Sequence, residues 1–268
     1  MLKDITLGQY FPGTTVVHRM DPRAKLILLV AYVVALFVAK GAAAYGLVAA
    51  FLVTAVVLSR IRPRALFKGL KPIIIIVILT AVLNLFYSGG ERVIFRFWRI
   101  TATWEGLETA VYMALRIVML ITGTFLLTYT TSPIALTDGL EALLNPLKRI
   151  KVPVHEISMM MCIALRFIPT LIEETDKIMS AQKARGADFE SGNLLQRAKA
   201  LVPILVPLFI GAFRRADELA TAMECRCYQG GTGRTKMKVL KYARRDVVAL
   251  ALGTVLVTGV IVLKTLGV

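Results

Sequence analysis

The chain has 268 residues, of which 57% are hydrophobic, and its 33 Lys and Arg against 17 Asp and Glu give a formal net charge of +16. Soluble domains are about 45–50% apolar even when glycine is counted, so this excess argues against a soluble enzyme. The apolar residues form long runs separated by charged segments, which predicts an integral membrane protein. In such a protein, clustered Lys and Arg indicate topology and contact with anionic lipid headgroups, not with nucleic acid.

The first apolar run, residues 24–58, is broken only at Lys40-Gly41. It is too long for one helix across a hydrocarbon layer of about 30 Å, so it predicts two short helices, one of which could be tilted or re-entrant. Asp21-Pro22 before the run is typical of an N-cap followed by the first helical residue. In chain order, the five predicted spans cover residues 24–39, 42–59, 72–88, 105–130 and 246–264, the last with Asp246 as its cap.

Two segments between these spans have a different character. Residues 60–71 carry five Lys and Arg and predict a basic loop. Residues 91–104 alternate apolar and polar positions and are rich in β-forming residues, which predicts a short hairpin at the membrane surface, where Trp98 and Trp104 suit the interface. Within the third span, Thr80 and Asn84 are expected to hydrogen-bond between helices.

Residues 132–245 hold 18 of the 33 Lys and Arg and show no sign of a soluble α/β domain. Their spacing predicts amphipathic helices, of which the longest cover 154–185 and 193–228. Gly186 ends the first of these as a C′ glycine would, and the second contains two prolines that should kink it. One apolar face of 154–185 carries Ile157, Met160, Met161, Ala164, Leu165 and Ile168.

The distribution of Lys and Arg predicts the orientation, because loops on the cytoplasmic side carry an excess of positive charge. Four lie in residues 1–25, five in 60–71 and 18 in 132–245. The N-terminus and residues 132–245 are therefore expected in the cytoplasm, and the C-terminus outside. This organisation gives four spans in 1–131, cytoplasmic helices in 132–245 and the last span in 246–268.

Two arginines stand out by their position. Arg185 and Arg226 each lie at the end of a long amphipathic helix on the predicted cytoplasmic side. A cation near the negative end of the helix dipole is one explanation for a single such site. Because there are two, a two-fold partner is the more plausible explanation.

These motifs resemble those of a known family, the EcfT/CbiQ family of T components of energy-coupling factor transporters, over essentially the whole chain. The family's signature is a pair of arginine-centred motifs, usually Ala-Arg-Gly, at the ends of cytoplasmic coupling helices. Ala184-Arg185-Gly186 matches fully, whereas Cys225-Arg226-Cys227 departs at both flanking positions. The other segments that carry the resemblance are 18–25, 131–133, 166–169 and 222–228.

The resemblance implies a membrane subunit of a prokaryotic ABC importer for a vitamin or trace metal. In that family the two arginine motifs dock into two ABC-type ATPase subunits, and the helices hold a substrate-binding S component. Arg185 and Arg226 would then contact the ATPases, and the apolar face of 154–185 would contact the S component. Arginine suits such docking because its planar fork of donors pairs bidentately with carboxylates.

The sequence lacks the residues for its own catalysis. The dipeptide Gly-Lys occurs nowhere, so no phosphate-binding loop is present and no ATP hydrolysis is expected. His155-Glu156 begins like a zinc-protease motif, but residue 159 is Met. Cys225 and Cys227 lack partners for a zinc site and are expected to be reduced thiols, so no metal or cofactor is predicted.

Arg116 lies inside the fourth predicted span, and a charge within the membrane is a candidate functional site. It could neutralise Glu108, make a polar contact with another subunit, or serve a structural role in the bundle. The rival function is a self-contained secondary permease, which would predict paired half-repeats and interrupted helices.

Overall fold

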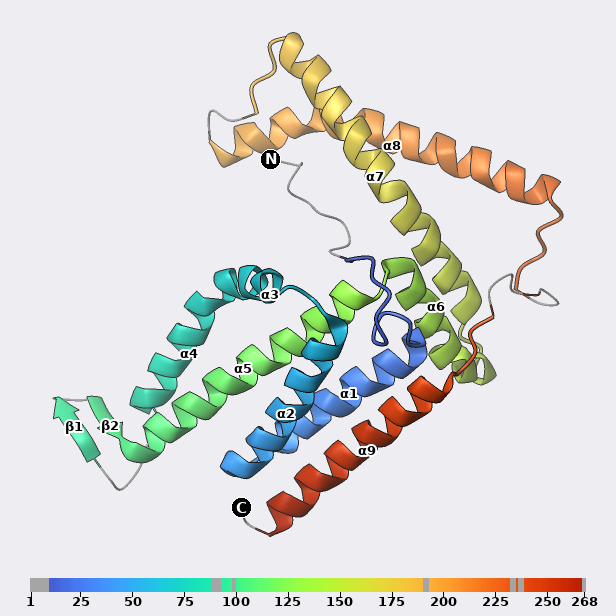
Figure 1. Ribbon diagram of the computed structural model, residues 1–268. Helices are drawn as coiled ribbons and strands as arrows, with labels where there is room; N and C mark the ends of the chain where they lie inside the picture. The colour runs from blue at the N-terminus through green and yellow to red at the C-terminus, as the bar shows by residue number, and fades with distance from the viewer. Residues whose placement is uncertain are drawn as a thin grey trace. The chain divides into compact units, whose positions relative to one another are not determined.

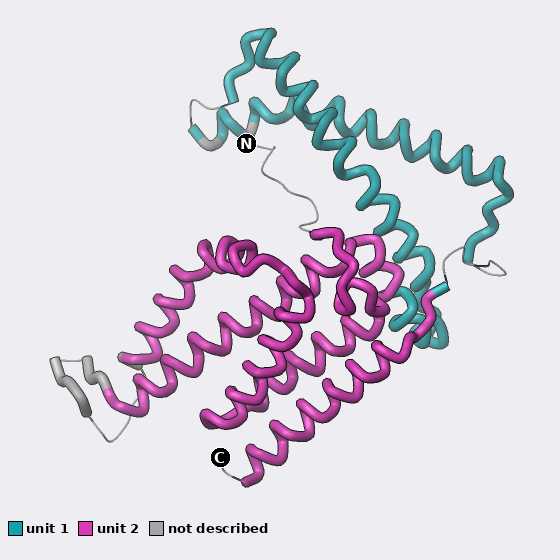
Figure 2. The backbone as a smooth tube through the Cα atoms, in the orientation of Figure 1, with its two compact units in different colours: residues 1–7, 141–239 teal, residues 8–140, 240–268 magenta. Residues whose placement is uncertain are grey.

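The computed structural model describes residues 10–87, 93–97, 100–189, 193–231, 235 and 239–266. The chain forms two compact units (Figure 2): unit 1 holds residues 1–7 and 141–239, and unit 2 holds residues 8–140 and 240–268. The elements of unit 2 are α1 (Pro22–Val38), α2 (Gly41–Ser59), α3 (Pro63–Leu70), the 3-10 turn η2 (Lys71–Ile73), α4 (Ile74–Tyr87), β1 (Val93–Phe97), β2 (Ile100–Thr103), α5 (Trp104–Thr130) and α9 (Arg244–Thr265). Unit 1 contains η3 (Asn145–Ile150), α7 (Val154–Ala184) and α8 (Leu194–Cys225), and the boundary falls within α6 (Pro133–Leu144) (Figure 1).

The predicted all-α membrane protein is confirmed, since α1, α2, α4, α5 and α9 cover the five predicted spans within a few residues. Among the described residues, six helical stretches are long and apolar enough to cross a membrane: α2, residues 63–85, α5, α7, α8 and α9. The 17 residues of α1 give a length of only about 25 Å.

The predicted basic loop at 60–71 is wrong in part, because α3 occupies most of it. Pro63 stands at the first helical position, where its missing N–H costs no hydrogen bond. Leu66 is buried while Phe67 is exposed, so this short helix is amphipathic. The charges remain in the segment, but they lie on and beside a helix.

The outer surface of α4 is strongly apolar. This helix packs along α5, and its isoleucines on the other side are exposed, Ile75 to 73%. Soluble proteins rarely expose contiguous apolar patches of this kind, so lipid or a partner subunit must cover them. Within α4, Thr80 and Asn84 hydrogen-bond to Ile76 and Thr80 carbonyls of the same helix, so the prediction that they bond between helices is wrong.

The core of unit 2 lies where α1, α2, α5 and α9 meet. Tyr32 is 4% exposed and donates its hydroxyl to the Met119 carbonyl of α5 at 2.9 Å, which satisfies the phenol in an apolar environment. Small residues allow close approach, because a β-carbon at Gly123 would lie 2.6 Å from the Tyr32 ring and one at Gly253 would lie 2.5 Å from Leu28. Such small residues at helix contacts are typical of membrane bundles.

One buried carboxylate connects the starts of α1 and α9. Asp246 is 1% exposed and accepts the backbone N–H of Asp21 at 2.9 Å and that of Ala243 at 2.7 Å. Ala243 is the N-cap of α9, so Asp246 does cap the helix, but from inside its first turn. Asp21 caps α1 as predicted, since its carboxylate accepts the N–H of Arg23.

Asp21 also holds an ion pair with Arg23, with 2.9 Å between Oδ2 and Nη2. Burial raises the pKa of the Asp21 carboxyl, but hydrogen bonds from the side chain and backbone of Arg23 more than offset burial and hold it below its usual value. Because the folded-state pKa is lowered, the ionised carboxylate stabilises the fold at neutral pH. That contribution is lost as the pH falls through the lowered pKa.

The predicted hairpin is present. β1 and β2 pair antiparallel with Arg96 opposite Thr101, and the register shifts between Val93 and Phe95. Trp104 begins α5 and is 58% exposed, as suits an interfacial tryptophan, while Trp98 lies outside the described residues.

We expect Asp246→Asn to lower the free energy of unfolding by about 1–3 kcal/mol, because one of the two N–H groups that donate to this carboxylate loses its acceptor. Asp246→Ala removes both acceptors and should cost more. Thermal unfolding in detergent measures the effect, with Asp217→Asn, an exposed carboxylate on α8, as the matched control. Equal melting temperatures for Asp246→Ala and the wild type would show that this connection contributes nothing.

Candidate functional site: two helix ends that present arginine

The end of α7 is a Schellman motif. Arg185 is the C-cap residue, and Gly186 follows it in the left-handed region with φ 87°. The N–H of Gly186 donates to the Lys183 carbonyl and that of Ala187 to the Gln182 carbonyl, both at 3.0 Å. These are the two bonds that define the motif, and glycine suits its left-handed position because it has no β-carbon.

The end of α8 has the same backbone structure with different residues. Arg226 is the C-cap residue, the Cys227 N–H donates to the Glu224 carbonyl at 2.8 Å, and the Tyr228 N–H donates to the Met223 carbonyl at 3.0 Å. Cys227 therefore occupies the left-handed position, with φ 55°. A side chain in this conformation costs about 1–2 kcal/mol, so the second end is strained where the first is not.

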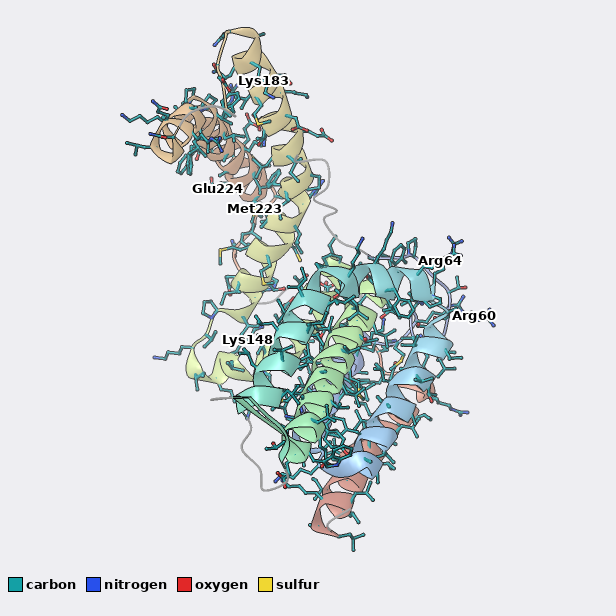
Figure 3. All side chains as sticks on the ribbon, turned by 90° about the vertical axis from the view of Figure 1, so that its left-hand side faces the viewer. Arg60, Arg64, Lys148, Lys183, Met223 and Glu224 are labelled. Atoms are coloured by element: carbon teal, nitrogen blue, oxygen red, sulfur yellow. The ribbon has the colours of Figure 1, made fainter. Side chains whose placement is uncertain are left out.

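The two arginines are thus structurally equivalent. Their backbone angles are φ −89°, ψ 7° for Arg185 and φ −95°, ψ 16° for Arg226. Both are exposed, and in the described part of the chain neither forms an ion pair. Figure 3 labels Lys183 near the end of α7, and Met223 and Glu224 near the end of α8. Each helix end therefore presents one guanidinium that has no charged partner within the described chain.

The six apolar residues predicted on one face of α7 differ in their exposure. Ile157, Met160 and Met161 are 42%, 57% and 39% exposed. Ala164 is also exposed, whereas Leu165 and Ile168 are half-buried. Ile163, Phe167 and Leu171 of α7 line a groove that residues of α8 also line. The exposed residues of the predicted face are not covered by the described part of the chain.

Arg116 contacts aromatic residues instead of Glu108. Its Nε donates to the Tyr45 hydroxyl at 2.9 Å, and its guanidinium carbon lies 5.6 Å from the centre of the Phe37 ring. Tyr45 lies in α2 and is 3% exposed, so the contact connects α5 to α2. No ion pair with Glu108 occurs among the described residues.

The described residues contain no group of three His, Cys, Asp or Glu side chains that could hold a metal ion. His155 is paired with Glu141, with 3.0 Å between Nδ1 and Oε1. Cys225 and Cys227 are free thiols and lie exposed beside Arg226.

The sequence analysis did not predict the ion pair between Glu174 of α7 and Arg215 of α8. The two residues are 41 positions apart, and no local pattern connects them. One signal in the sequence could have indicated the pair: Glu174 is eleven residues before Arg185, and Arg215 is eleven residues before Arg226.

We expect Cys227→Gly to strengthen the end of α8 by about 1 kcal/mol, because glycine relieves the left-handed strain. Gly186→Ala should weaken the end of α7 by a similar amount. Hydrogen exchange of the capping N–H groups measures both, and about fivefold slower or faster exchange corresponds to 1 kcal/mol. Faster exchange in Cys227→Gly would contradict the assignment of strain to this residue.

Comparison with known proteins agrees with these features. The family model for cobalt transport proteins, CbiQ, matches residues 13–237. The energy-coupling factor transporter transmembrane protein EcfT of Clostridium kluyveri is 56% identical over 258 residues, which is 96% of both chains. The EcfT proteins of Thermosediminibacter oceani and Bacillus subtilis are 55% and 51% identical, over 96% and 92% of this chain and 97% and 93% of their own. The chain therefore belongs to the EcfT/CbiQ family, the T components of energy-coupling factor transporters, and is a multi-pass membrane subunit of such a transporter.

Proposed function

We propose that the protein couples ATP hydrolysis by two ABC-type ATPase subunits to substrate uptake through a separate S component. The observation that carries this proposal is the equivalence of Arg185 and Arg226, each at the C-cap of a Schellman motif. Two equivalent docking groups suit a partner that is itself two-fold. One arginine would contact each ATPase.

The chemistry of arginine favours this use. A guanidinium remains charged at all relevant pH values and can pair with a carboxylate through two parallel hydrogen bonds. At a C-cap the side chain projects from the last turn of a stiff helix, so a force on the arginine acts on the whole helix. Ala184 and Gly186 at the first end, and Cys225 and Cys227 at the second, would contact the ATPase surface around each arginine.

The protein itself is proposed to be non-catalytic. It has no phosphate-binding loop, so the ATPase partners would hydrolyse ATP. The family name, cobalt transport protein, favours a metal ion as cargo, and a vitamin is the other class we consider. In either case the S component would select the substrate, with Ile157, Met160 and the rest of the exposed α7 face as its contact surface.

The arrangement of unit 2 supports the proposed orientation. Lys25 of α1 donates to the Thr130 carbonyl at the end of α5 at 2.9 Å, and Asp21 bonds to Asp246 at the start of α9. Arg60 and Arg64 project from this same unit at the end of α2 and on α3 (Figure 3). Because positive charge concentrates on the cytoplasmic side, we assign this end of unit 2 to the cytoplasm.

On this assignment, the predicted cytoplasmic segment, residues 132–245, begins and ends on the cytoplasmic side of the membrane. Although α7 and α8 are long and apolar enough to span, each carries clustered charges in one half, such as Glu173 to Lys177 and Arg214 to Glu218. Charges in such numbers are costly within hydrocarbon. We therefore assign α7 and α8 to the cytoplasmic surface as coupling helices.

A topology reporter fused after Val268 should report the external side, and one inserted near Gly192 should report the cytoplasm. Alkaline phosphatase and green fluorescent protein fusions, which are active on opposite sides, make the measurement. Detection of both positions on one side would overturn the assignment of α7 and α8.

The coupling role predicts a graded response to loss of the arginines. Arg185→Ala or Arg226→Ala alone should reduce uptake more than assembly, because the remaining contact still tethers the ATPase dimer. The double substitution should release the ATPases, since each lost pair costs about 2–5 kcal/mol when it strands a buried acid. Substitution of either arginine by lysine should restore uptake only in part, because an ammonium group cannot form two parallel hydrogen bonds with a carboxylate.

Co-purification of both partners with each variant, beside uptake into vesicles, tests this prediction. S-component binding should persist in the arginine variants, whereas Met160→Asp should weaken S-component binding more than ATPase binding. Undiminished uptake by the double variant would refute the proposed function.

A further inference from the structure

An ion pair joins α7 to α8 between Glu174 Oε2 and Arg215 Nη2, and we call these two residues the crossing pair. Both side chains are 27% exposed, so the contact is largely shielded from solvent. Gly211 leaves room for the carboxylate, because a β-carbon there would lie 3.0 Å from Glu174 Oε1. By contrast, the neighbouring pair Arg214–Glu218 lies within α8 and is 82% and 66% exposed.

The crossing pair lies at the same distance from the terminal arginine in both helices. Glu174 is eleven residues before Arg185, and Arg215 is eleven residues before Arg226. At about 1.5 Å per residue, both arms from the crossing pair to the arginines are about 17 Å long. Figure 1 shows that α7 and α8 cross and that their C-terminal ends diverge.

The surroundings of the crossing pair leave the crossing angle weakly held by packing. A groove of about 270 Å³, partly open to the surface, lies between the helices, and its lining includes Arg215 of the crossing pair, Ile163, Phe167 and Leu171 of α7, and Ala212 and Ala216 of α8. Close-packed side chains resist rotation, whereas a groove leaves the facing side chains without contacts on one side. The ion pair is thus the specific link at a loosely packed crossing.

We propose that Glu174 and Arg215 are positioning residues that set the spacing between Arg185 and Arg226, and through it the simultaneous docking of two ATPases. The proposal rests on the proposed function, in which these arginines are the ATPase contacts. With arms of about 17 Å, a rotation of about 10° at the crossing moves an arginine by about 3 Å. A displacement of that size separates a guanidinium from its carboxylate, so both contacts form only at one crossing angle.

The spacing can be measured directly in the full-length protein in nanodiscs. Spin labels at Ala181→Cys and Ala222→Cys, each four residues before an arginine and exposed, report the distance by double electron–electron resonance. The background carries Cys162→Ser, Cys225→Ala and Cys227→Gly, so that only the introduced thiols react. Uptake by the complete transporter is measured with the Glu174 and Arg215 substitutions in the chain that keeps its native cysteines, because Cys225 and Cys227 belong to the proposed docking surface.

Glu174→Gln and Arg215→Gln should each broaden and shift the distance distribution and lower uptake about fivefold or more, a typical size for lost coupling between sites. The exchange variant, Glu174→Arg with Arg215→Glu, should restore a narrow distribution and most of the uptake. Matched controls are Glu173→Gln and Arg214→Gln, adjacent exposed residues of the same types on the same helices, which should change neither quantity.

The outcomes separate the two proposals. An unchanged distance distribution in both single variants overturns the role of the crossing pair and leaves the ATPase linkage untouched. If the single variants fail to fold, an exchange variant that folds without recovering the spacing also overturns it. A broadened distribution with undiminished uptake, together with full uptake in Arg185→Ala/Arg226→Ala, overturns the proposed function instead.

Discussion

The hydrogen bonds of Asp246 hold together chain segments that lie 225 residues apart. The first N–H groups of any helix lack partners inside the helix, and here one buried carboxylate satisfies such groups at the starts of α1 and α9. A buried N–H without an acceptor is unfavourable, so α1 and α9 must begin side by side. The rest of unit 2 depends on this connection, because α9 supplies Leu256 and Val260 to its core.

The same connection has a consequence for unit 1. α5 ends where Thr130 accepts from Lys25, close to the Asp21 that bonds to Asp246. The chain therefore leaves unit 2 and re-enters it at the same end of the helix bundle. Residues 141–239 of unit 1 form the connection between these two points. A segment inserted in this way can carry docking surfaces without interrupting the packing of the membrane helices.

The ends of α7 and α8 show that the same backbone motif can form twice in one chain from different residues. Gly186 and Cys227 occupy the same left-handed position, and the same two hydrogen bonds close each helix. Glycine lowers the strain of that position but does not create the motif, since the bonds come from the backbone. Equivalent geometry at Arg185 and Arg226 thus survives the replacement of glycine by cysteine.

The membrane class, the helices and their approximate ends could be predicted from the sequence, because run length, periodicity and capping residues are local properties. Examples are the N-cap Asp21, the helix-ending Gly186 and the hairpin of β1 and β2, all of which were predicted. The prediction of a loop at 60–71 was wrong in part, because the eight residues of α3 are too few for periodicity to reveal a helix. The domain boundaries and the orientation remain predictions.

The sequence by itself determined the family, through its two arginine motifs, and the apolar stretches that suit a membrane. Only the tertiary structure decided which polar groups meet. Thr80 and Asn84 form hydrogen bonds within their own helix. Arg116 donates to Tyr45 instead of pairing with Glu108, and Glu174 pairs with Arg215. The physical reason is that helix formation follows from neighbours in sequence, whereas a hydrogen bond or ion pair between helices requires a specific rotation and depth of each helix. Those are settled only when all the helices pack at once.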